Sequence, residues 1–361
     1  MNNLIKKIPL LLLIITGSLQ AQMGYNKWVD IVRKNPTAWF QTEVAKAVAE
    51  NVLLYQKDIG GWHKNIEMQK PISEEEKAKL KAEKSDPKGC TTDNNATYQE
   101  MNFLGRIYQE VPDERYKAAF LLGLDYILKA QYENGGWPQY YPLKKGYYTH
   151  ITYNDNSMYN IMVLLKSIID YKKFYTIDIP EDKIKNCQVA FEKGISCILK
   201  TQYKQDGVLT AWCAQHDEVT FLPTNARAYE LASLSGKESA KLVLLLMSID
   251  RPSPEIVTAV TAADDWFRKV KITDTKVERV YDENGKVTDT KLVNEPDAPF
   301  LWARFMELDN NKPFFCDRDG IKKYSLEEIG AERRNGYSWY SNEPKEVLKK
   351  FYKWKKKNNL E

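Results

Sequence analysis

Apolar positions recur with a helical period through most of the chain. Tyr116, Phe120, Leu124 and Ile127 fall at i, i+4, i+8 and i+11, the spacing of a helix that packs one apolar face on a neighbour. Similar stripes, separated by proline and glycine breaks, predict a series of helices. Their expected spans are 37–57, 95–110, 113–131, 156–176, 181–203, 223–235, 238–249 and 253–270.

One of these helices is repeated. Residues 120–132 and 191–203 are identical at seven of thirteen positions, and a weaker third copy ends at Gln56. Each copy runs into a turn that contains glycine, and the roughly 70 residues between copies leave room for a second helix and two loops. Gly123 and Gly194 interrupt the apolar pattern at a cost of about 1 kcal/mol each relative to alanine, so we expect close helix packing there. Three such hairpins predict an (α/α)3 toroid.

The pattern changes after residue 271. Alternating residues at 276–281 and 286–293 flank a turn that ends at Gly285, which predicts a β-hairpin. We further expect short strands or extended chain at 301–308 and 313–317, and a last helix that begins near residue 343. The charged segment 71–90 should be a surface insertion. The predicted fold is therefore mainly α, with a toroid over 22–270. A smaller mixed α/β part over 271–361 packs on it, within one domain, 22–361.

The first 21 residues predict export. Lys6 and Lys7 precede the apolar run 8–15, and small residues lead to a cleavage site after Ala21. The run is shorter than the roughly 18 residues that a membrane helix needs, and no later stretch is apolar enough to span a bilayer. We therefore expect a secreted or periplasmic protein without a membrane span.

Net charge and sequence fingerprints give no sign of a nucleic-acid partner. Without Lys6 and Lys7 the formal charge falls from +4 to about +2, which is too small to indicate a polyanionic partner. The lysines of the run 349–357 are expected to lie on the solvated end of the last helix. The chain also lacks a phosphate-binding loop and a nucleotide fingerprint. We expect a monomer that binds no nucleic acid.

The cysteines and histidines do not predict a transition-metal site. The five cysteines fit neither metal-site nor disulfide-framework spacing. Cys187 and Cys197 should lie about 15 Å apart on one helix, which is too far for a disulfide. The histidines are too scattered for zinc: His63, His150 and His216. His150 is expected to be a structural neighbour of Asp155.

Polar clusters stand where the next helix begins after each repeat. The first holds Asp93 and Asn94, the second Asp155 and Asn156, and the third Arg227. In a toroid of hairpins these junctions share a rim, so we expect them to converge on one cleft. Asp and Asn are preferred helix N-caps, but clustered oxygens without His or Cys are also what calcium prefers. From the residues alone, capping and a calcium site both stay open.

The charged residues narrow the chemistry. Two carboxylates on one rim could act as the acid and base of a glycosidase. Arg227, with Arg304 and Arg318, instead favours an acidic sugar, because arginine forks bind carboxylates bidentately. Trp62 and Trp137 directly follow Gly-Gly turns, so we expect their rings to stack on the sugar, although core packing is the alternative for each.

Several motifs, in order, resemble the pectate lyases of polysaccharide lyase family 10. They are GGWHKN (60–65), TTDNNAT (91–97), QYENGGWPQYYP (131–142), ITYNDNSM (151–158), NARAYELASLSG (225–236), WARFMEL (302–308) and FFCDRDG (314–320). The resemblance covers about residues 40–340. It implies an α/α toroid, calcium dependence, and cleavage of α-1,4-linked polygalacturonate by anti β-elimination.

The resemblance also implies roles for single residues. Asp155 corresponds to the family's calcium-binding aspartate, and Asp93 to the aspartate needed for activity beside substrate and cation. Arg227 corresponds to the arginine that removes the C5 proton, while Arg304 and Arg318 correspond to arginines that hold uronate groups. The candidate metal ligands are then Asp155, Asp93, Asn94 and Asn156.

Arginine is an unusual base because its pKa lies above about 12. We expect a nearby cation and the other arginines to push Arg227 toward its neutral form, and the remaining mismatch predicts an alkaline optimum. Two alternatives stay open. One is an inverting glycoside hydrolase that uses Asp93 and Asp155 as acid and base, and the other is a non-catalytic glycan-binding protein.

Overall fold

The computed structural model describes residues 27–171 and 175–360. The expected signal peptide, 1–21, lies outside the described residues. In the described part, none of the helices combines the length and the apolarity needed to cross a bilayer. The chain forms two compact units, the first up to residue 129 with 167–184, the second 130–166 with 185–361. This division does not fall near residue 270, where the sequence suggested the end of the toroid.

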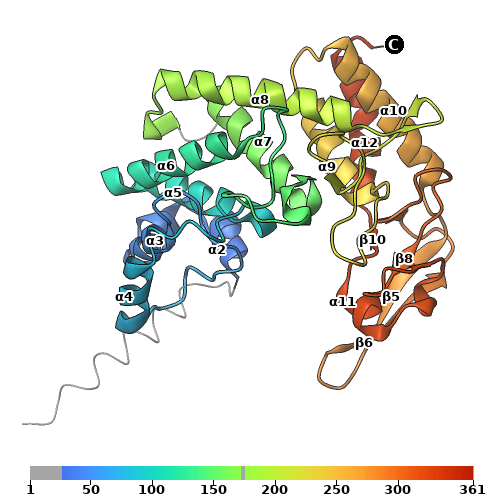
Figure 1. The fold of residues 1–361 in the computed structure, drawn as a ribbon, viewed down its shortest axis with the longest axis horizontal. Helices are drawn as coiled ribbons and strands as arrows, with labels where there is room; N and C mark the ends of the chain where they lie inside the picture. The colour runs from blue at the N-terminus through green and yellow to red at the C-terminus, as the bar shows by residue number, and fades with distance from the viewer. Residues whose placement is uncertain (1–26, 172–174, 361) are drawn as a thin grey trace, which may run out of the picture. The chain divides into compact units, whose positions relative to one another are not determined.

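The first unit is helical. Its helices are α2 (Trp28–Lys34), α3 (Glu43–Tyr55), α4 (Glu74–Ala82), α5 (Tyr98–Glu110) and α6 (Glu114–Ala130), with the 3-10 turns η1 (Thr37–Gln41), η2 (Asp93–Asn95) and η5 (Tyr175–Ile177) (Figure 1). The expected helix 37–57 is broken, because Thr42 accepts a hydrogen bond from Ala45 N (3.2 Å) and starts α3 anew. The charged segment 71–90 contains α4, which has no buried residue and therefore lies on the surface.

The second unit carries the remaining helices. They are α7 (Ser157–Ile169), α8 (Glu181–Thr201), α9 (Gly236–Met247), α10 (Pro254–Val270), α11 (Ala331–Gly336) and α12 (Pro344–Lys357), with η3 (Tyr147–Thr149), η4 (Asn154–Asn156) and η6 (Leu326–Glu328). In sequence, α7 and α8 each cross the boundary between the units. The C-terminal helix α12 packs on α9 and α10. The mixed C-terminal part is thus packed on helices of its own unit, as expected.

Among the described residues, the strands form two-stranded antiparallel sheets. The pairs are β1 (Ile151–Thr152) with β4 (Gln215–His216), β2 (Lys204–Gln205) with β3 (Val208–Leu209), β5 (Thr275–Tyr281) with β6 (Val287–Asn294), β7 (Trp302–Ala303) with β10 (Tyr340–Ser341), and β8 (Phe315–Cys316) with β9 (Lys322–Lys323). The pair β5–β6 confirms the predicted hairpin. Its turn closes through Asp282 N and Lys286 O (2.9 Å), and Gly285 adopts a φ of 75° there.

The expected helix 223–235 is wrong. This segment is a loop in which some backbone donors bind carbonyls of other segments and two bind side chains. Arg227 N donates to Glu230 Oε2 (3.3 Å), and Ala232 N donates to Asn225 Oδ1 (2.7 Å). Asn and Glu side chains that bind nearby N–H groups offer the backbone an alternative to the helix. The apolar pattern of the segment does not reveal this competition.

The repeated glutamine explains why the repeat is recognisable in sequence. In each copy its Nε2 donates to a carbonyl of its own turn and to a carbonyl of a following helix. The acceptors are Gly60 and Ala119 for Gln56, Gly135 and Ala190 for Gln131, and Thr210 and Ala259 for Gln202, at 2.8–3.0 Å. A Cβ on Gly123 would lie 3.0 Å from Met101 Sδ, as the expected close packing requires. One polar side chain therefore fixes each turn against its neighbouring helix.

Gly135→Ala should cost more stability than Gly207→Ala. Both glycines have a positive φ, 91° and 82°, a region that costs an L-residue about 1–2 kcal/mol. At Gly135 a Cβ would also overlap the backbone carbonyl of Lys193, whereas nothing lies within 4 Å of a Cβ on Gly207. We expect Gly135→Ala to lower the free energy of unfolding in urea by a further 1–3 kcal/mol or so. Equal losses would contradict the close approach.

His216 is buried as a neutral imidazole. Its Nε2 accepts a hydrogen bond from Cys213 N (3.0 Å), so Nδ1 carries the proton and donates to Phe221 O (2.8 Å). Burial lowers the pKa of His216 to about 4. In the unfolded chain the imidazole of His216 has a pKa near 6.5, so as pH falls it takes up a proton in the unfolded state before it does so in the folded state. The free energy of unfolding should therefore drop between about pH 6.5 and 4, by up to roughly 3 kcal/mol.

The test compares wild type with His216→Gln in urea unfolding at neutral pH and near pH 4.5. Burial raises the pKa of Glu100 to about 7, so this carboxyl opposes the effect of His216 in the same range. The difference between the two proteins removes this contribution. We expect the variant to lose less stability on acidification. If the free energy of unfolding of the variant falls with pH as steeply as that of wild type, His216 does not cause the acid destabilisation.

Candidate active site

The second junction forms a left-handed turn at the start of α7. Asp155 has a φ of 49° and Asn156 a φ of 64°, which Asp and Asn tolerate because their short side chains bond locally. Asn154 Nδ2 donates to Asp155 Oδ2 (2.9 Å). The turn holds the Asp155 carboxylate at the start of the helix with its side chain 33% exposed.

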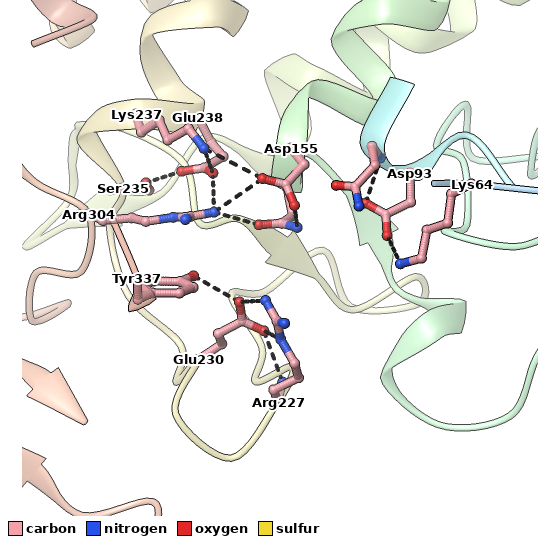
Figure 2. Close-up of polar contacts among 12 residues, drawn as sticks. Lys64, Asp93, Asp155, Arg227, Glu230, Ser235, Lys237, Glu238, Arg304 and Tyr337 are labelled. Carbon is pink, nitrogen blue, oxygen red and sulfur yellow. Dashed lines mark hydrogen bonds and ion pairs between the residues drawn. The ribbon is translucent and has the colours of Figure 1, made fainter. Parts of the chain in front are cut away.

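Two cations face the same oxygen of Asp155. Lys237 Nζ lies 3.5 Å and Arg304 Nη2 3.6 Å from Oδ1 (Figure 2). Burial raises the pKa of Asp155, but the charges on Arg304 and Lys237 and the hydrogen bond from Asn154 outweigh it, so the pKa is lowered overall. The carboxylate is therefore ionised at neutral pH.

Arg304 supports Asp155 from within the unit. Its side chain is 4% exposed, and its Nη2 donates to Asn154 Oδ1 (2.8 Å) and Glu238 Oε1 (2.9 Å). The guanidinium also lies over the ring of Tyr337 at 4.7 Å. Glu238 is buried too and accepts from the hydroxyl of Ser235. With its charge balanced by Glu238, Arg304 acts here as a support, and direct contact with a uronate stays a prediction.

Arg227 is held by a buried carboxylate. Arg227 Nε donates to Glu230 Oε2 (2.6 Å) and Nη2 to Oε1 (2.5 Å), a bidentate pair (Figure 2). Burial keeps the pKa of Tyr337 well above its usual value, so its hydroxyl stays protonated and donates to Glu230 Oε1 (2.8 Å). Arg227 itself is 44% exposed. The loop 223–235 thus presents a fixed, accessible guanidinium.

The pair with Glu230 opposes the expected shift of Arg227 toward its neutral form. The hydrogen bonds and charge of Glu230 raise the pKa of Arg227 above its ordinary value, and burial opposes them only in part. The expectation considered the other cations and missed the carboxylate three residues away. In the structure, Arg227 is therefore a guanidinium cation.

Three arginines surround one buried tyrosine. The guanidinium carbons of Arg227, Arg318 and Arg333 lie 4.9, 5.6 and 4.6 Å from the ring centre of Tyr229. Arg318 is exposed and pairs with Glu332 (3.1 Å), which also pairs with Arg333. The ring face attracts cations, so Tyr229 gathers positive charge beside Arg227. Arg318 thus lies near the same ring as Arg227, and its binding of a uronate stays a prediction.

The first junction, in the other unit, has its own ion pair. Asp93 is buried, Lys64 binds its Oδ2, and Oδ1 accepts from Asn94 N (2.9 Å). Thr97 follows with φ 63° and ψ −50° in a γ-turn closed by Tyr98 N and Ala96 O (2.7 Å). A β-branched residue is strained there by roughly 1–3 kcal/mol. The hydroxyl of Thr97 holds the turn by donating to Thr91 O (2.9 Å).

The first and second junctions have the same pair of left-handed residues. This shared geometry corrects the residue-by-residue alignment of the two junctions that the sequence suggested. Asn94 and Asn95 have φ values of 50° and 65°, matching the 49° and 64° of Asp155 and Asn156. The equivalent residues are Asp93 with Asn154, Asn94 with Asp155, and Asn95 with Asn156. The two aspartates are therefore not equivalent, although both junctions begin a helix. A capping role for the asparagines alone does not explain this shared left-handed turn.

Trp62 and Trp137 are core residues, so their expected role in stacking on sugar is wrong. They are 0% and 1% exposed, and Trp212 in the third repeat is equally buried. Trp62 Nε1 donates to Val52 O and Trp212 Nε1 to Ile198 O, both at 2.8 Å. The Gly-Gly turn sends the indole inward under the helix. No ring face remains for a ligand.

His150 forms a cluster with two acidic residues. Its Nδ1 lies 2.9 Å from Glu218 Oε2, and with Asp217 these groups bring three ligand atoms within 4.8 Å of one another. Burial raises the pKa of Glu218, but its hydrogen bonds with His150, Thr149 and the backbone and its charge interaction with His150 together outweigh burial, so the pKa is lowered overall. That His150 is a structural neighbour of Asp155 stays a prediction.

The side chains at the second junction carry oxygen atoms, the type of ligand that calcium prefers. Calcium takes about six to eight oxygen ligands, and Asp155 offers an ionised, partly exposed carboxylate, with Asn156 as the next residue of the same turn. Glu238 is excluded because it is buried against Arg304. Two side chains are too few, so water, substrate carboxylates or other protein oxygens would complete the shell. Asp93 and Asn94 stay predicted ligands.

Several site residues were missed at the sequence level. They are Lys64, Lys237, Glu238, Arg333 and Tyr229. Lys64 lies inside the GGWHKN motif and Lys237 directly follows the NARAYELASLSG motif, so proximity to a motif was the available signal. The contact of Tyr337 with Glu230 spans 107 residues, so no local pattern reveals it.

The helical fold, with several arginines and an ionised aspartate in one unit, is compatible with a polysaccharide lyase, and the comparisons with known proteins identify this class. The pectic acid lyase family matches residues 56–348, and the protein belongs to this family. A search of curated proteins finds no match. The chain is similar to the family 10 polysaccharide lyase from Cellvibrio cellulosa, with a TM-score of 0.74 and 34% identity over 88% of this chain and 96% of that chain.

A second solved structure is a mutant of the same Cellvibrio cellulosa lyase in complex with trigalacturonic acid. Here the TM-score is 0.76 and the identity 33%, over 90% of this chain and 95% of that chain. These similarities confirm the family resemblance and the predicted fold class, a mainly α helical toroid with a smaller mixed part. The protein is a pectate lyase by family and fold.

Proposed function

We propose that the protein is a secreted, calcium-dependent pectate lyase that cleaves α-1,4-linked polygalacturonate by anti β-elimination, releasing unsaturated oligogalacturonides. The observation that carries this proposal is the gathering, in one unit, of an accessible Arg227 and the ionised Asp155 with supporting cations. The trigalacturonic acid bound to the similar lyase supports the choice of substrate.

The reaction suits such a site. The C5 proton of galacturonate is α to a carboxylate, so neutralising that carboxylate stabilises the enolate that forms when a base removes the proton. The electron pair then forms the C4–C5 double bond, and the C4–O bond breaks with departure of the glycosidic oxygen. Calcium, when bound at Asp155, would supply positive charge at the substrate carboxylate. Arg318 and the cluster around Tyr229 would bind uronates.

Arg227 is the proposed base, and its partner sets the pH dependence. Since Glu230 raises the pKa of Arg227, only a small fraction is neutral at pH 7, and this fraction grows about tenfold per pH unit below the pKa. We expect kcat to rise from neutral toward about pH 10, as the base must be unprotonated. An initial-rate profile that is flat over this range would contradict the assignment.

The glycosidase alternative is not favoured. An inverting hydrolase needs one carboxyl with a raised pKa to protonate the leaving group; the lowered pKa of Asp155 leaves this residue only the role of base, and the family match favours a lyase. The alternative of a binding protein without activity predicts no product at all. Single-domain organisation over 22–361, a monomeric state and export directed by residues 1–21 remain part of the proposal.

Calcium dependence is tested by chelation. The purified protein is incubated with polygalacturonate, with and without EDTA, and the ultraviolet absorbance of the unsaturated product is followed. We expect EDTA to abolish the absorbance and added calcium to restore it. Asp155→Asn should raise the calcium concentration needed for half activity, while Asp125→Asn, an exposed aspartate on α6, serves as the control. Full activity in EDTA would contradict the role of calcium.

A further inference from the structure

A groove outside the candidate active site lies between the hairpin β5–β6 and the segment 337–342. Its volume is about 420 Å³, within the roughly 300–1,000 Å³ of small-molecule sites. Three kinds of wall line it: one face of the hairpin, the segment 337–342, and apolar side chains between them. The side chains from outside 337–342 are Val277, Arg279, Tyr281, Thr290, Leu301 and Leu326.

The hairpin turns two exposed side chains into the groove. Val277, Arg279 and Tyr281 alternate along β5 and therefore share one face, and Arg279 stands opposite Thr290 on β6. Tyr281 is 56% exposed. Within residues 27–171 and 175–360, Arg279 makes no ion pair, unlike the other arginines discussed above. The groove thus offers an uncommitted guanidinium beside an open aromatic ring.

Two hydroxyls that line the groove lack partners. Thr290 Oγ1 and Ser341 Oγ are buried and have no hydrogen-bond partner among the residues that the structure describes, and Thr290 is 5% exposed. Each such group costs about 1–3 kcal/mol, and native proteins retain few of them. A bound hydroxyl or carboxylate would satisfy them.

The walls of the groove are held in place by α11. Arg334 Nε donates to Asp289 Oδ1 and Asn335 Nδ2 donates to Thr288 O, both at 2.9 Å, which ties α11 to β6. Trp339 Nε1 donates to Arg333 O (3.0 Å) and fixes the facing segment. A preformed groove needs little ordering when a ligand binds.

We propose that this groove is an accessory binding site for a galacturonate residue of the pectate chain. Arg279 supplies the bidentate donor for a carboxylate, Tyr281 a ring for stacking on the sugar, and Thr290 and Ser341 bind its hydroxyls. Tyr337 links the groove to the candidate active site, because its ring lines the groove while its hydroxyl binds Glu230. The choice of galacturonate as the acidic sugar rests on the proposed function.

The experiment measures amide hydrogen exchange with and without trigalacturonic acid. All proteins carry Arg227→Ala so that the ligand stays intact, and the readout is protection of residues 275–281 and 337–342. We expect trigalacturonic acid to protect both segments from exchange. We expect Arg279→Ala or Tyr281→Ala to raise the ligand concentration needed for half-maximal protection about tenfold or more. Lys291→Ala is the matched control, because Lys291 is paired with Glu278 on the opposite face of the hairpin; it should change nothing.

The outcomes separate the groove from the proposed reaction. No protection at 275–281, or unchanged protection in Arg279→Ala, would overturn the accessory site. Equal protection by a neutral α-1,4-galactotriose would overturn the assignment to an acidic sugar. Cleavage of the ligand in the Arg227→Ala background would refute the proposed base but leave the protection result, and hence the groove, intact.

Discussion

Arg227→Ala should lower kcat for polygalacturonate by about 10²–10⁴-fold, the usual contribution of a positioned general base. The loop 223–235 places this guanidinium at the surface, 44% exposed, with its direction set by both oxygens of Glu230. The measurement is the initial rate of ultraviolet absorbance at saturating substrate and at alkaline pH, where wild type is expected to be fastest.

A loss of folding must be separated from a loss of chemistry. Removal of Arg227 leaves Glu230 buried with Tyr337 as its remaining side-chain donor, at a cost of about 1–3 kcal/mol. The double variant Arg227→Ala, Glu230→Gln removes this buried charge and should recover stability without activity. Arg115→Ala, which removes another arginine held by carboxylates, should keep the wild-type rate. The base assignment fails if the double variant keeps a tenth of the wild-type kcat.

Arg304→Ala should destabilise the protein by about 3–5 kcal/mol, because it leaves a buried carboxylate without its main partner. Glu238 is 2% exposed, and Arg304 binds it at 2.9 Å while also binding Asn154. The free energy of unfolding in urea measures the loss. We also expect weaker activity in the folded fraction, since Asp155 loses one of its two positive neighbours.

A paired variant tests whether the effect comes from the buried ion pair. Arg304→Met with Glu238→Leu replaces both charges by apolar groups of similar size, which is often close to neutral for stability. We expect it to recover most of the unfolding free energy while activity stays low. If Arg304→Ala unfolds within about 1 kcal/mol of wild type, the pair is not the buried support that its geometry indicates.

The repeated helix could be predicted because its physical cause is local. The spacing of apolar residues, the glycine turn and the glutamine lie within a short stretch, and the structure gives each a contact that needs that residue type. The hairpin β5–β6 was predictable for the same reason. The prediction of a helix over 223–235 was wrong although the apolar spacing favoured it. The side chains of Asn225 and Glu230 accept hydrogen bonds from the backbone of this segment and favour a loop.

The candidate site could be predicted only in part. Asp93, Asp155 and Arg227 stand out as polar clusters at the ends of repeats, but their partners come from distant segments. Arg304 contacts Asn154 across 150 residues, a relation that no local pattern contains. Burial is equally invisible: Trp62 follows a turn, as an exposed sugar platform would, yet packs in the core.

The most direct test of the central claim counts products. Polygalacturonate is digested by the wild-type protein with calcium, and reducing ends and unsaturated ends are measured in the same samples over time. β-Elimination predicts one unsaturated end for each new reducing end, and none of either with the Arg227→Ala, Glu230→Gln variant. New reducing ends without ultraviolet absorbance would identify a hydrolase and contradict the proposed reaction.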